Sequence, residues 1–428
     1  MNPFKETATD TMRMIKNFHE IYPRPYEKRE VDPYTRTRVI LMCGTEFEAN
    51  WFSHQMARHT DDRDLLRELA LTRYIEKQQQ QKIALLKPRD ESVLEHTIGY
   101  EQLAVDLTAE LAKRERDCNV KKALDFALLE DFDHLYRYAD LLEMTEGVRA
   151  ERLVGKYTEI MPARPTVAHH RFPKDNVKRH IDSKCADIAT VLHTMIITAA
   201  EQQTMNFYMN VSNAATSDIS RRLYEEIALV EEEHVTQYES LMDPNASWLE
   251  MLLLHEYCEC YLYWSCYMTE TDCYIKALWE EYLTFEIGHL HKAAELLKKY
   301  EKKDVCEVIP NPEFPEPLSL HSNIDYVRDI LASTVQYTSD REDYKRVEDL
   351  TGDADFYRFQ GILIPSVKIA PSHEVIEKFI ERRGEDYRYE TAPNPIPALR
   401  DRRTDNTDVG RVAGAAPSTD FKCNTKPE

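Results

Sequence analysis

The chain has 428 residues, enough for two domains of ordinary size with additional segments. Its 55 basic and 76 acidic side chains give a net charge of -21, and a field of this sign disfavours nucleic acid and anionic lipid surfaces as partners. Only 10 residues are glycine and 31% are charged, a composition that favours long helices over sheets. The sequence therefore predicts an all-α protein that binds neither nucleic acid nor membrane.

No apolar run approaches the roughly 20 residues that a membrane-spanning helix needs, and residues 1–10 lack the apolar stretch of a signal peptide. The 9 cysteines are an odd number, and no CxxC pair suggests a zinc site or a rubredoxin-type iron site. We therefore expect a cytoplasmic protein whose cysteines are reduced.

Helix-breaking residues divide the first half of the chain into a series of long predicted helices. An N-terminal extension, residues 1–33, comes first. A set of four helices follows within residues 34–147, at 34–58, 62–86, 91–116 and 120–146. Residues 148–183 contain several prolines and no hairpin pattern, and we interpret them as a connection between two halves.

The second half repeats this organisation. Four further helices are predicted within residues 184–300, at 184–210, 217–242, 247–268 and 271–300. Residues 301–390 form a proline-rich C-terminal extension with two short predicted helices, 323–335 and 373–383. Residues 391–428 have the composition of a disordered tail.

An acidic residue precedes a histidine by three positions in three predicted helices. The pairs are Asp131/His134, Glu231/His234 and Glu286/His289. This spacing puts both side chains on one helix face, where both can bind one metal ion. A further glutamate lies 30 residues before each acid, at Glu101, Glu201 and Glu256. In a helical hairpin this separation sets two acids level on adjacent antiparallel helices, which is how di-iron carboxylate bundles are built.

A series of four acidic residues with a fixed spacing, which we call the acidic ladder, occurs twice in the chain. It comprises Glu201, Glu231, Glu256 and Glu286 in the second half and, 155 residues earlier, Glu46, Glu76, Glu101 and Asp131. His134 and His289 also coincide at this offset. The sequence therefore predicts an internal duplication of a four-helix unit. One position departs from the symmetry, because Gln79 corresponds to His234.

These motifs resemble those of the rubrerythrins, a family of the ferritin-like superfamily. The resemblance covers about residues 34–300 and is carried by Glu46-Phe-Glu-Ala-Asn50, Glu201-Gln-Gln-Thr-Met-Asn206, the acid/histidine pairs and Glu256-Tyr-Cys-Glu259. It implies two tandem ferritin-like four-helix bundles that hold iron pairs, with manganese as the alternative metal. Glutamates of first and third helices would be terminal ligands, and the acids paired with histidines would bridge two ions. Glu259 would replace the imidazole that Gln79 lacks.

Ferritin-like bundles have parallel second and third helices, but only 25 residues separate Glu231 from Glu256. The loop would have to cover roughly 28 Å along the bundle, whereas about six loop residues reach little more than 20 Å. We therefore predict that the two halves exchange hairpins. One site would combine Glu101, Asp131, His134, Glu201, Glu231 and His234. The other would combine Glu46, Glu76, Gln79, Glu256, Glu259, Glu286 and His289.

The resemblance implies a non-haem di-iron oxidoreductase that acts on peroxide or dioxygen. Electrons would come from an external donor protein, because the chain has no rubredoxin module. The alternative is a metal-binding or ferroxidase protein without an organic substrate, and a third reading is a helical scaffold whose acids face solvent. The chain could also form a homo-oligomer.

Several neighbouring residues are predicted to lie outside the metal sites. His169, His170 and His180 lack ligand spacing and are expected to be polar groups of the connection. Glu232 and Glu233 are expected on the surface. The aromatic run of Tyr257, Tyr261, Tyr263, Trp264 and Tyr267 is expected to pack in the core rather than to carry radicals.

Overall fold

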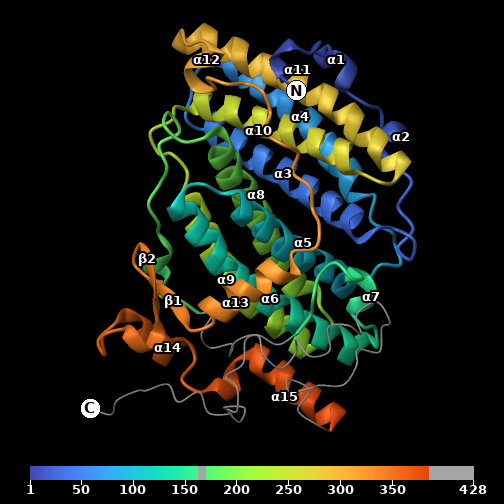
Figure 1. Cartoon of the computed structure of the whole chain (residues 1–428). Coiled ribbons are helices and arrows are strands. Elements are labelled where there is room, and N and C mark those ends of the chain that lie inside the picture. The colour runs from blue at the N-terminus through green and yellow to red at the C-terminus, as the bar shows by residue number, and fades with distance from the viewer. Residues whose placement is uncertain (162–169, 385–428) are drawn as a thin grey trace.

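The structure is a computed structural model that describes residues 1–161 and 170–384 (Figure 1). Eight long helices dominate the described residues: α3 (Pro33–Ala57), α4 (Arg63–Ala84), α5 (Val93–Arg114), α6 (Cys118–Glu146), α8 (Ile188–Ala214), α9 (Asp218–Glu239), α10 (Trp248–Thr269) and α11 (Cys273–Glu301). They lie within a few residues of the eight predicted helices, and the all-α prediction is confirmed. No helix in the described ranges is both long and apolar enough to cross a membrane.

Each long helix begins at a side chain that accepts hydrogen bonds from its first turn. The capping residues are Asp32, Asp62, Ser92 and Asp117 in the first half and Asp187, Ser217, Ser247 and Asp272 in the second. Every residue of the second set lies 155 positions after its counterpart. A cap of this kind stabilises a helix by about 1 kcal/mol. The duplication therefore fixes where the helices start as well as the acidic ladder.

The helices pair as four hairpins: α3/α4, α5/α6, α8/α9 and α10/α11. The α5/α6 hairpin packs on α8/α9, and we call these four helices group A. The α3/α4 hairpin packs on α10/α11, which makes group B, in the upper part of Figure 1. Each group takes one hairpin from each half of the chain, in agreement with the predicted exchange.

The two groups meet where α3 and α8, the first helices of the two halves, pack against each other. Gly44 of α3 permits this close approach, because a Cβ atom there would lie 3.0 Å from the Cβ of Gln203 on α8. A single cluster of buried apolar side chains runs through both groups. The two groups therefore share one continuous core.

Hydrogen bonds at the helix ends also link helices from different halves of the chain. Glu270, which follows α10, accepts a hydrogen bond from the hydroxyl of Thr35 at 2.5 Å. Glu115, which follows α5, accepts one from the hydroxyl of Thr190 at 2.7 Å. Both members of one pair lie 155 residues from those of the other. The same threonine–glutamate hydrogen bond therefore links α3 to α10 in group B and α8 to α5 in group A.

The repeat also extends upstream of residue 34, into the segments predicted as extension and connection. The backbone N–H of Lys16 donates to the side chain of Gln78 at 2.9 Å, and that of Arg171 donates to Glu233 at 3.2 Å. Lys16 and Arg171 are separated by 155 residues, as are their partners. A second pair of backbone bonds, Tyr26 to Leu86 and Ile181 to Leu241, has the same relation. The duplicated unit is thus longer than the acidic ladder indicates.

Short elements cover the outside of the groups. They are η1 (Pro3–Lys5), α1 (Thr11–Met14), α2 (Phe18–Ile21), α7 (Glu151–Val154), η3 (Pro173–Asn176), α12 (Val305–Val308), α13 (Ile324–Thr334), η4 (Val347–Asp349), α14 (Asp355–Leu363), η5 (Val367–Ile369) and α15 (Pro371–Arg383). The two predicted C-terminal helices are confirmed as α13 and α15, and both pack on α6. The predicted disordered tail lies outside the described residues.

The sequence did not predict α14 or the antiparallel pair β1 (Tyr337–Asp340) and β2 (Asp343–Arg346). The strands turn at Arg341, which has φ 56. Neither strand alternates apolar and polar residues, so the usual signal of a half-buried strand is missing. Their place is set by contacts with the connection, where the Lys178 amine donates to the Arg341 carbonyl at 2.7 Å.

Candidate metal centres

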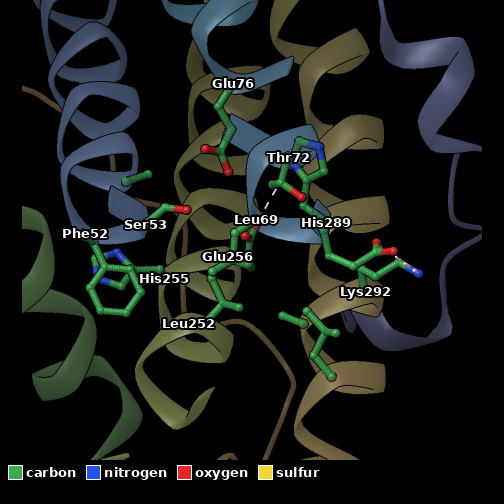
Figure 2. Close-up of a pocket in the computed structure, with 14 residues that line it drawn as sticks. Phe52, Ser53, Leu69, Thr72, Glu76, Leu252, His255, Glu256, His289 and Lys292 are labelled. Atoms are coloured by element: carbon green, nitrogen blue, oxygen red, sulfur yellow. Dashed lines mark ion pairs between the residues drawn. The ribbon is translucent and has the colours of Figure 1, made fainter. Parts of the chain in front are cut away.

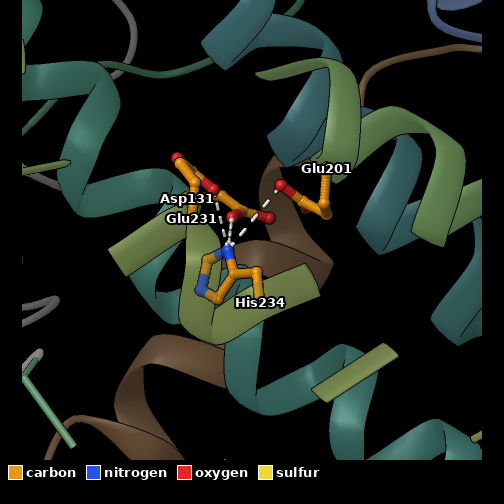
Figure 3. A group of neighbouring side chains, drawn as sticks. All are labelled: Asp131, Glu201, Glu231 and His234. Carbon is orange, nitrogen blue, oxygen red and sulfur yellow. Dashed lines mark hydrogen bonds and ion pairs between the residues drawn. The ribbon is translucent and has the colours of Figure 1, made fainter. Parts of the chain in front are cut away.

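Site A lies inside group A and contains all six residues predicted for it. They are Glu101, Asp131, His134, Glu201, Glu231 and His234, each at most 1% exposed. Their ligand atoms form two sets, each within 4.8 Å: Asp131, Glu201, Glu231 and His234 (Figure 3), and Glu101, His134 and Glu231. Glu231 belongs to both sets, which is the place of a bridging carboxylate.

The two oxygens of Glu231 face different histidines. Oε1 lies 3.0 Å from Nδ1 of His134, and Oε2 lies 3.0 Å from Nδ1 of His234. The Nδ1 atom of His234 also lies 3.4 Å from Asp131. One carboxylate thus serves two imidazoles on two helices, α6 and α9, as two neighbouring ions would require.

Several carboxylate oxygens of site A are buried without a hydrogen-bond partner in the described structure. They are both oxygens of Glu201, Oε2 of Glu101 and Oδ1 of Asp131. Burial raises the pKa of Glu101 and Glu201 well above the usual value, and that of Asp131 to about 7. Burial acts on Glu231 in the same direction, but the two histidines outweigh it and lower its pKa. Buried carboxylate oxygens that lack hydrogen bonds are costly, and cations between them would remove that cost.

Site B lies inside group B and again collects the predicted residues. Its acids and histidine are Glu46, Glu76, Glu256, Glu259, Glu286 and His289, each at most 3% exposed. Their ligand atoms form the sets Glu76, Glu256 and His289, and Glu256, Glu259 and Glu286. Glu256, predicted as a terminal ligand, is common to both sets. Glu46 belongs to neither set.

Gln79 occupies in site B the position that His234 holds in site A. Its amide nitrogen donates to Glu46 at 2.8 Å and to Glu286 at 2.5 Å. Both oxygens of Glu259 lack a hydrogen-bond partner among the described residues. Burial raises the pKa of Glu46 and Glu259 well above the usual value. Gln79 therefore holds Glu46 and Glu286 together, while Glu259 brings an additional carboxylate, as predicted.

A tyrosine hydroxyl donates to one glutamate in each site. Tyr208 of α8 donates to Glu101 at 2.5 Å, and Tyr263 of α10 donates to Glu46. Tyr257, Tyr261 and Tyr263 are buried, so the prediction of core packing is confirmed for these three. The sequence did not predict that any tyrosine would contact a candidate ligand.

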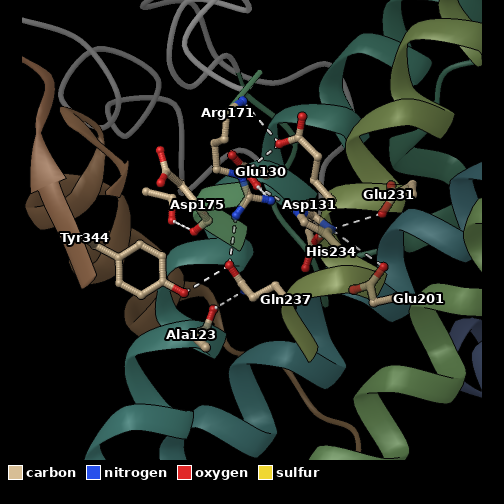
Figure 4. A network of polar contacts seen from close by, with 12 residues as sticks. Ala123, Glu130, Asp131, Arg171, Asp175, Glu201, Glu231, His234, Gln237 and Tyr344 are labelled. Atoms are coloured by element: carbon tan, nitrogen blue, oxygen red, sulfur yellow. Dashed lines mark hydrogen bonds and ion pairs between the residues drawn. The ribbon is translucent and has the colours of Figure 1, made fainter. Parts of the chain in front are cut away.

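A chain of buried charges supports His234 from outside site A (Figure 4). The Nε2 atom of His234 lies 2.7 Å from Glu130, and Glu130 forms an ion pair with Arg171 at 3.1 Å. Arg171 also pairs with Glu233 at 3.0 Å and donates to Gln237 at 2.8 Å. A carboxylate bound to the outer nitrogen of a ligating imidazole fixes the ring's orientation and tautomer. The Nδ1 atom is thereby left facing Glu231 and Asp131.

The prediction that Glu233 is a surface residue is wrong, because Arg171 from the connection reaches it and covers it. Glu232 is exposed, as predicted. A comparison of equivalent positions in the two halves gives a signal for these buried charges. Glu130 corresponds to the uncharged Phe285, and Glu233 corresponds to the uncharged Gln78. A carboxylate at a position that is uncharged in the other half indicates a partner found in one site only.

The two described histidines of the connection, His170 and His180, belong to none of the candidate ligand sets. His170 is 3% exposed and forms an ion pair with Glu226 at 3.0 Å. Burial lowers its pKa, but Glu226 outweighs this effect and raises it. His180 is exposed, and His169 lies outside the described residues. The eight described cysteines are free thiols, as predicted.

As the pH rises, we expect the metal affinity of the chain to increase and the free energy of unfolding of the metal-free chain to decrease. Burial raises the pKa of Asp131 and Glu76 to about 7. The metal-free folded chain therefore holds protons that the unfolded chain has released, and its free energy of unfolding falls as the pH rises through this range. Metal ions must displace these protons, so affinity rises with pH.

Thermal unfolding at about pH 6 and about pH 8, with and without Mn²⁺, measures both effects. We expect the midpoint of the metal-free chain to fall at the higher pH and the increase caused by Mn²⁺ to become larger. An equal increase at the two pH values would contradict the assignment of protonated ligands.

The chain matches no protein-family model, and comparisons with characterised proteins and with solved structures returned no match. The chemistry of the two sites is therefore inferred from their own residues. Imidazole and carboxylate donors suit iron and manganese, and the sets contain no thiolate.

Proposed function

We propose that both groups are ferritin-like bundles and that the chain is a di-iron carboxylate oxidoreductase. It would act on peroxide or dioxygen and take electrons from a separate donor protein. The observation that carries this proposal is Glu231, whose two oxygens each lie 3.0 Å from a different buried histidine. A buried carboxylate between two imidazoles suits a pair of ions better than a single ion.

The charges of site A support the same conclusion. Four buried carboxylates would carry four negative charges in a region without solvent, and two divalent cations would cancel them. Histidine and carboxylate donors together favour iron and manganese over the thiolate-bound zinc of structural sites. A bound iron pair supplies two electrons, one from each ion.

The side chains around the ions would fix the ligands and exclude bulk water. Glu130 holds the imidazole of His234, and Tyr208 holds Glu101. Reduction of one hydrogen peroxide takes up two electrons and two protons and gives two molecules of water. A separate donor protein would restore these electrons, since the sequence contains no CxxC pair for a rubredoxin-type iron site.

Metal analysis and peroxide turnover test this function. The chain expressed with iron is expected to hold about four iron ions, two at each site. After chemical reduction it should consume hydrogen peroxide with two electrons per molecule. A chain without bound metal would refute the proposal. Full iron loading without peroxide or dioxygen consumption would favour the alternative, a ferroxidase or iron-handling protein.

A further inference from the structure

We propose that the small oxidant enters at site B alone, and that tyrosine side chains close the equivalent entrance at site A. This inference rests on the proposed function, because it assigns the substrate to one of the two metal centres. It also limits that substrate to a molecule of the size of dioxygen or hydrogen peroxide.

A cavity in group B is lined both by three candidate ligands and by two partly exposed side chains, and Figure 2 shows the residues around it. Its inner end is formed by Glu76, Glu256 and His289, the same residues whose ligand atoms lie within 4.8 Å of one another. A metal ion held by three protein ligands beside a cavity keeps a position for an exogenous molecule. The cavity therefore meets site B where a substrate could bind.

The mouth of the cavity lies between α4 and α11. Glu68 and Lys292 line it, with side chains 42% and 35% exposed and 3.8 Å apart. The walls are mostly apolar and include Phe52, Leu69 and Leu252. The space between them is about that of a water molecule, which suits a diatomic or peroxide molecule and excludes a bulky organic substrate.

Site A has the same three ligands at its equivalent position. Glu231, Glu101 and His134 lie 155 residues from Glu76, Glu256 and His289, in the order of the repeat, and also form a set within 4.8 Å. The difference between the sites therefore does not lie in these ligands. It lies in the side chains in front of them.

Three positions in site A are occupied by tyrosines, and their counterparts in site B are small or aliphatic residues that line the cavity. Tyr208, Tyr224 and Tyr138 correspond to Ser53, Leu69 and Ala293. The three tyrosines are at most 1% exposed, and their ring centroids lie 4.9 to 5.6 Å apart. They contact one another and fill the space that is open in site B.

The mouth is closed in group A as well. Leu223 and Arg137, the counterparts of Glu68 and Lys292, are 0% and 1% exposed. Helix α15 packs on both α6 and α9, the helices that correspond to α11 and α4. The tyrosines therefore fill the space in front of the ligands of site A, and α15 lies against the two helices that carry Tyr138 and Tyr224.

Nitric oxide added to the anaerobic, iron(II)-loaded full chain tests this inference, since it is small and gives an EPR signal with iron(II). We expect the unmodified chain to form a nitrosyl signal at one of its two centres. Ala293→Tyr, which introduces the counterpart residue, should remove that signal and slow oxidation of site B by hydrogen peroxide by about tenfold or more. Iron content should not change.

Tyr138→Ala is the reciprocal variant and keeps the test decisive if Ala293→Tyr fails to fold. It should add a second nitrosyl signal and speed oxidation of site A. Equal nitrosyl formation at both centres of the unmodified chain would overturn the inference, as would no change in Tyr138→Ala. The absence of iron, or iron that peroxide and dioxygen do not oxidise in any variant, would instead refute the proposed function.

Discussion

Replacing Glu231 with alanine is expected to empty site A while site B keeps its metal. Each oxygen of Glu231 faces a different histidine, so its loss removes a ligand from both ions at once. Metal content should fall from about four ions per chain to about two. Anaerobic metal analysis with Mössbauer spectra measures this loss and identifies which centre remains.

Glu232→Ala is the matched control, because Glu232 lies on the same helix and is exposed. It should leave the metal content unchanged. Loss of a single ion from Glu231→Ala would show that Glu231 binds one ion only. An equal loss in both variants would show that the effect is on the fold rather than on the ligands.

Replacing Arg171 with methionine should strongly destabilise the fold. Arg171 is fully buried and pairs with Glu130 at 3.1 Å and Glu233 at 3.0 Å. Methionine keeps the apolar volume but removes the buried guanidinium that pairs with both carboxylates. Breaking a buried pair in this way costs about 3–5 kcal/mol. Urea unfolding of the metal-free chain, followed by circular dichroism, measures the loss.

Arg179→Met removes an exposed arginine of the same segment, whose partner Glu342 is also exposed, and should change stability little. Arg171→Lys keeps the charge and should restore part of the stability. If Arg171→Met were as stable as the unmodified chain, Glu130 and Glu233 would have to be protonated, and Glu130 could not orient His234 as an anion.

The sequence predicted the helices and the candidate ligands because both depend on local, periodic signals. Breakers and capping residues mark each helix, and the 155-residue repeat identifies Glu46 and Glu76, which have no histidine beside them. The exchange of hairpins was predicted from loop length and from the need to pair Gln79 with Glu259. The loop-length argument combines the rise of a helix and the reach of an extended chain with the parallel second and third helices that the resemblance to ferritin-like bundles implies.

The residues missed by the sequence act through contacts between distant segments. Arg171 belongs to a connection without regular structure, and its partner Glu130 looks like any charged residue of a helix. The tyrosines in front of site A look like core residues, and only their superposition on Ser53 and Ala293 shows what they close. Such roles depend on which side chains meet in space, and within the sequence only the comparison of the two halves gives a signal for them.

The crossing of the hairpins means that neither half of the chain contains all residues of a candidate metal site. A half-length polypeptide would complete both sites only by pairing with an identical copy around a two-fold axis. In such a pair the two sites would be the same by symmetry, and every substitution would appear in both. Joining the halves in one polypeptide removes that constraint. One site could then exchange a histidine for Gln79 and keep an opening beside Ala293, while the other gained its tyrosines and its support from Arg171.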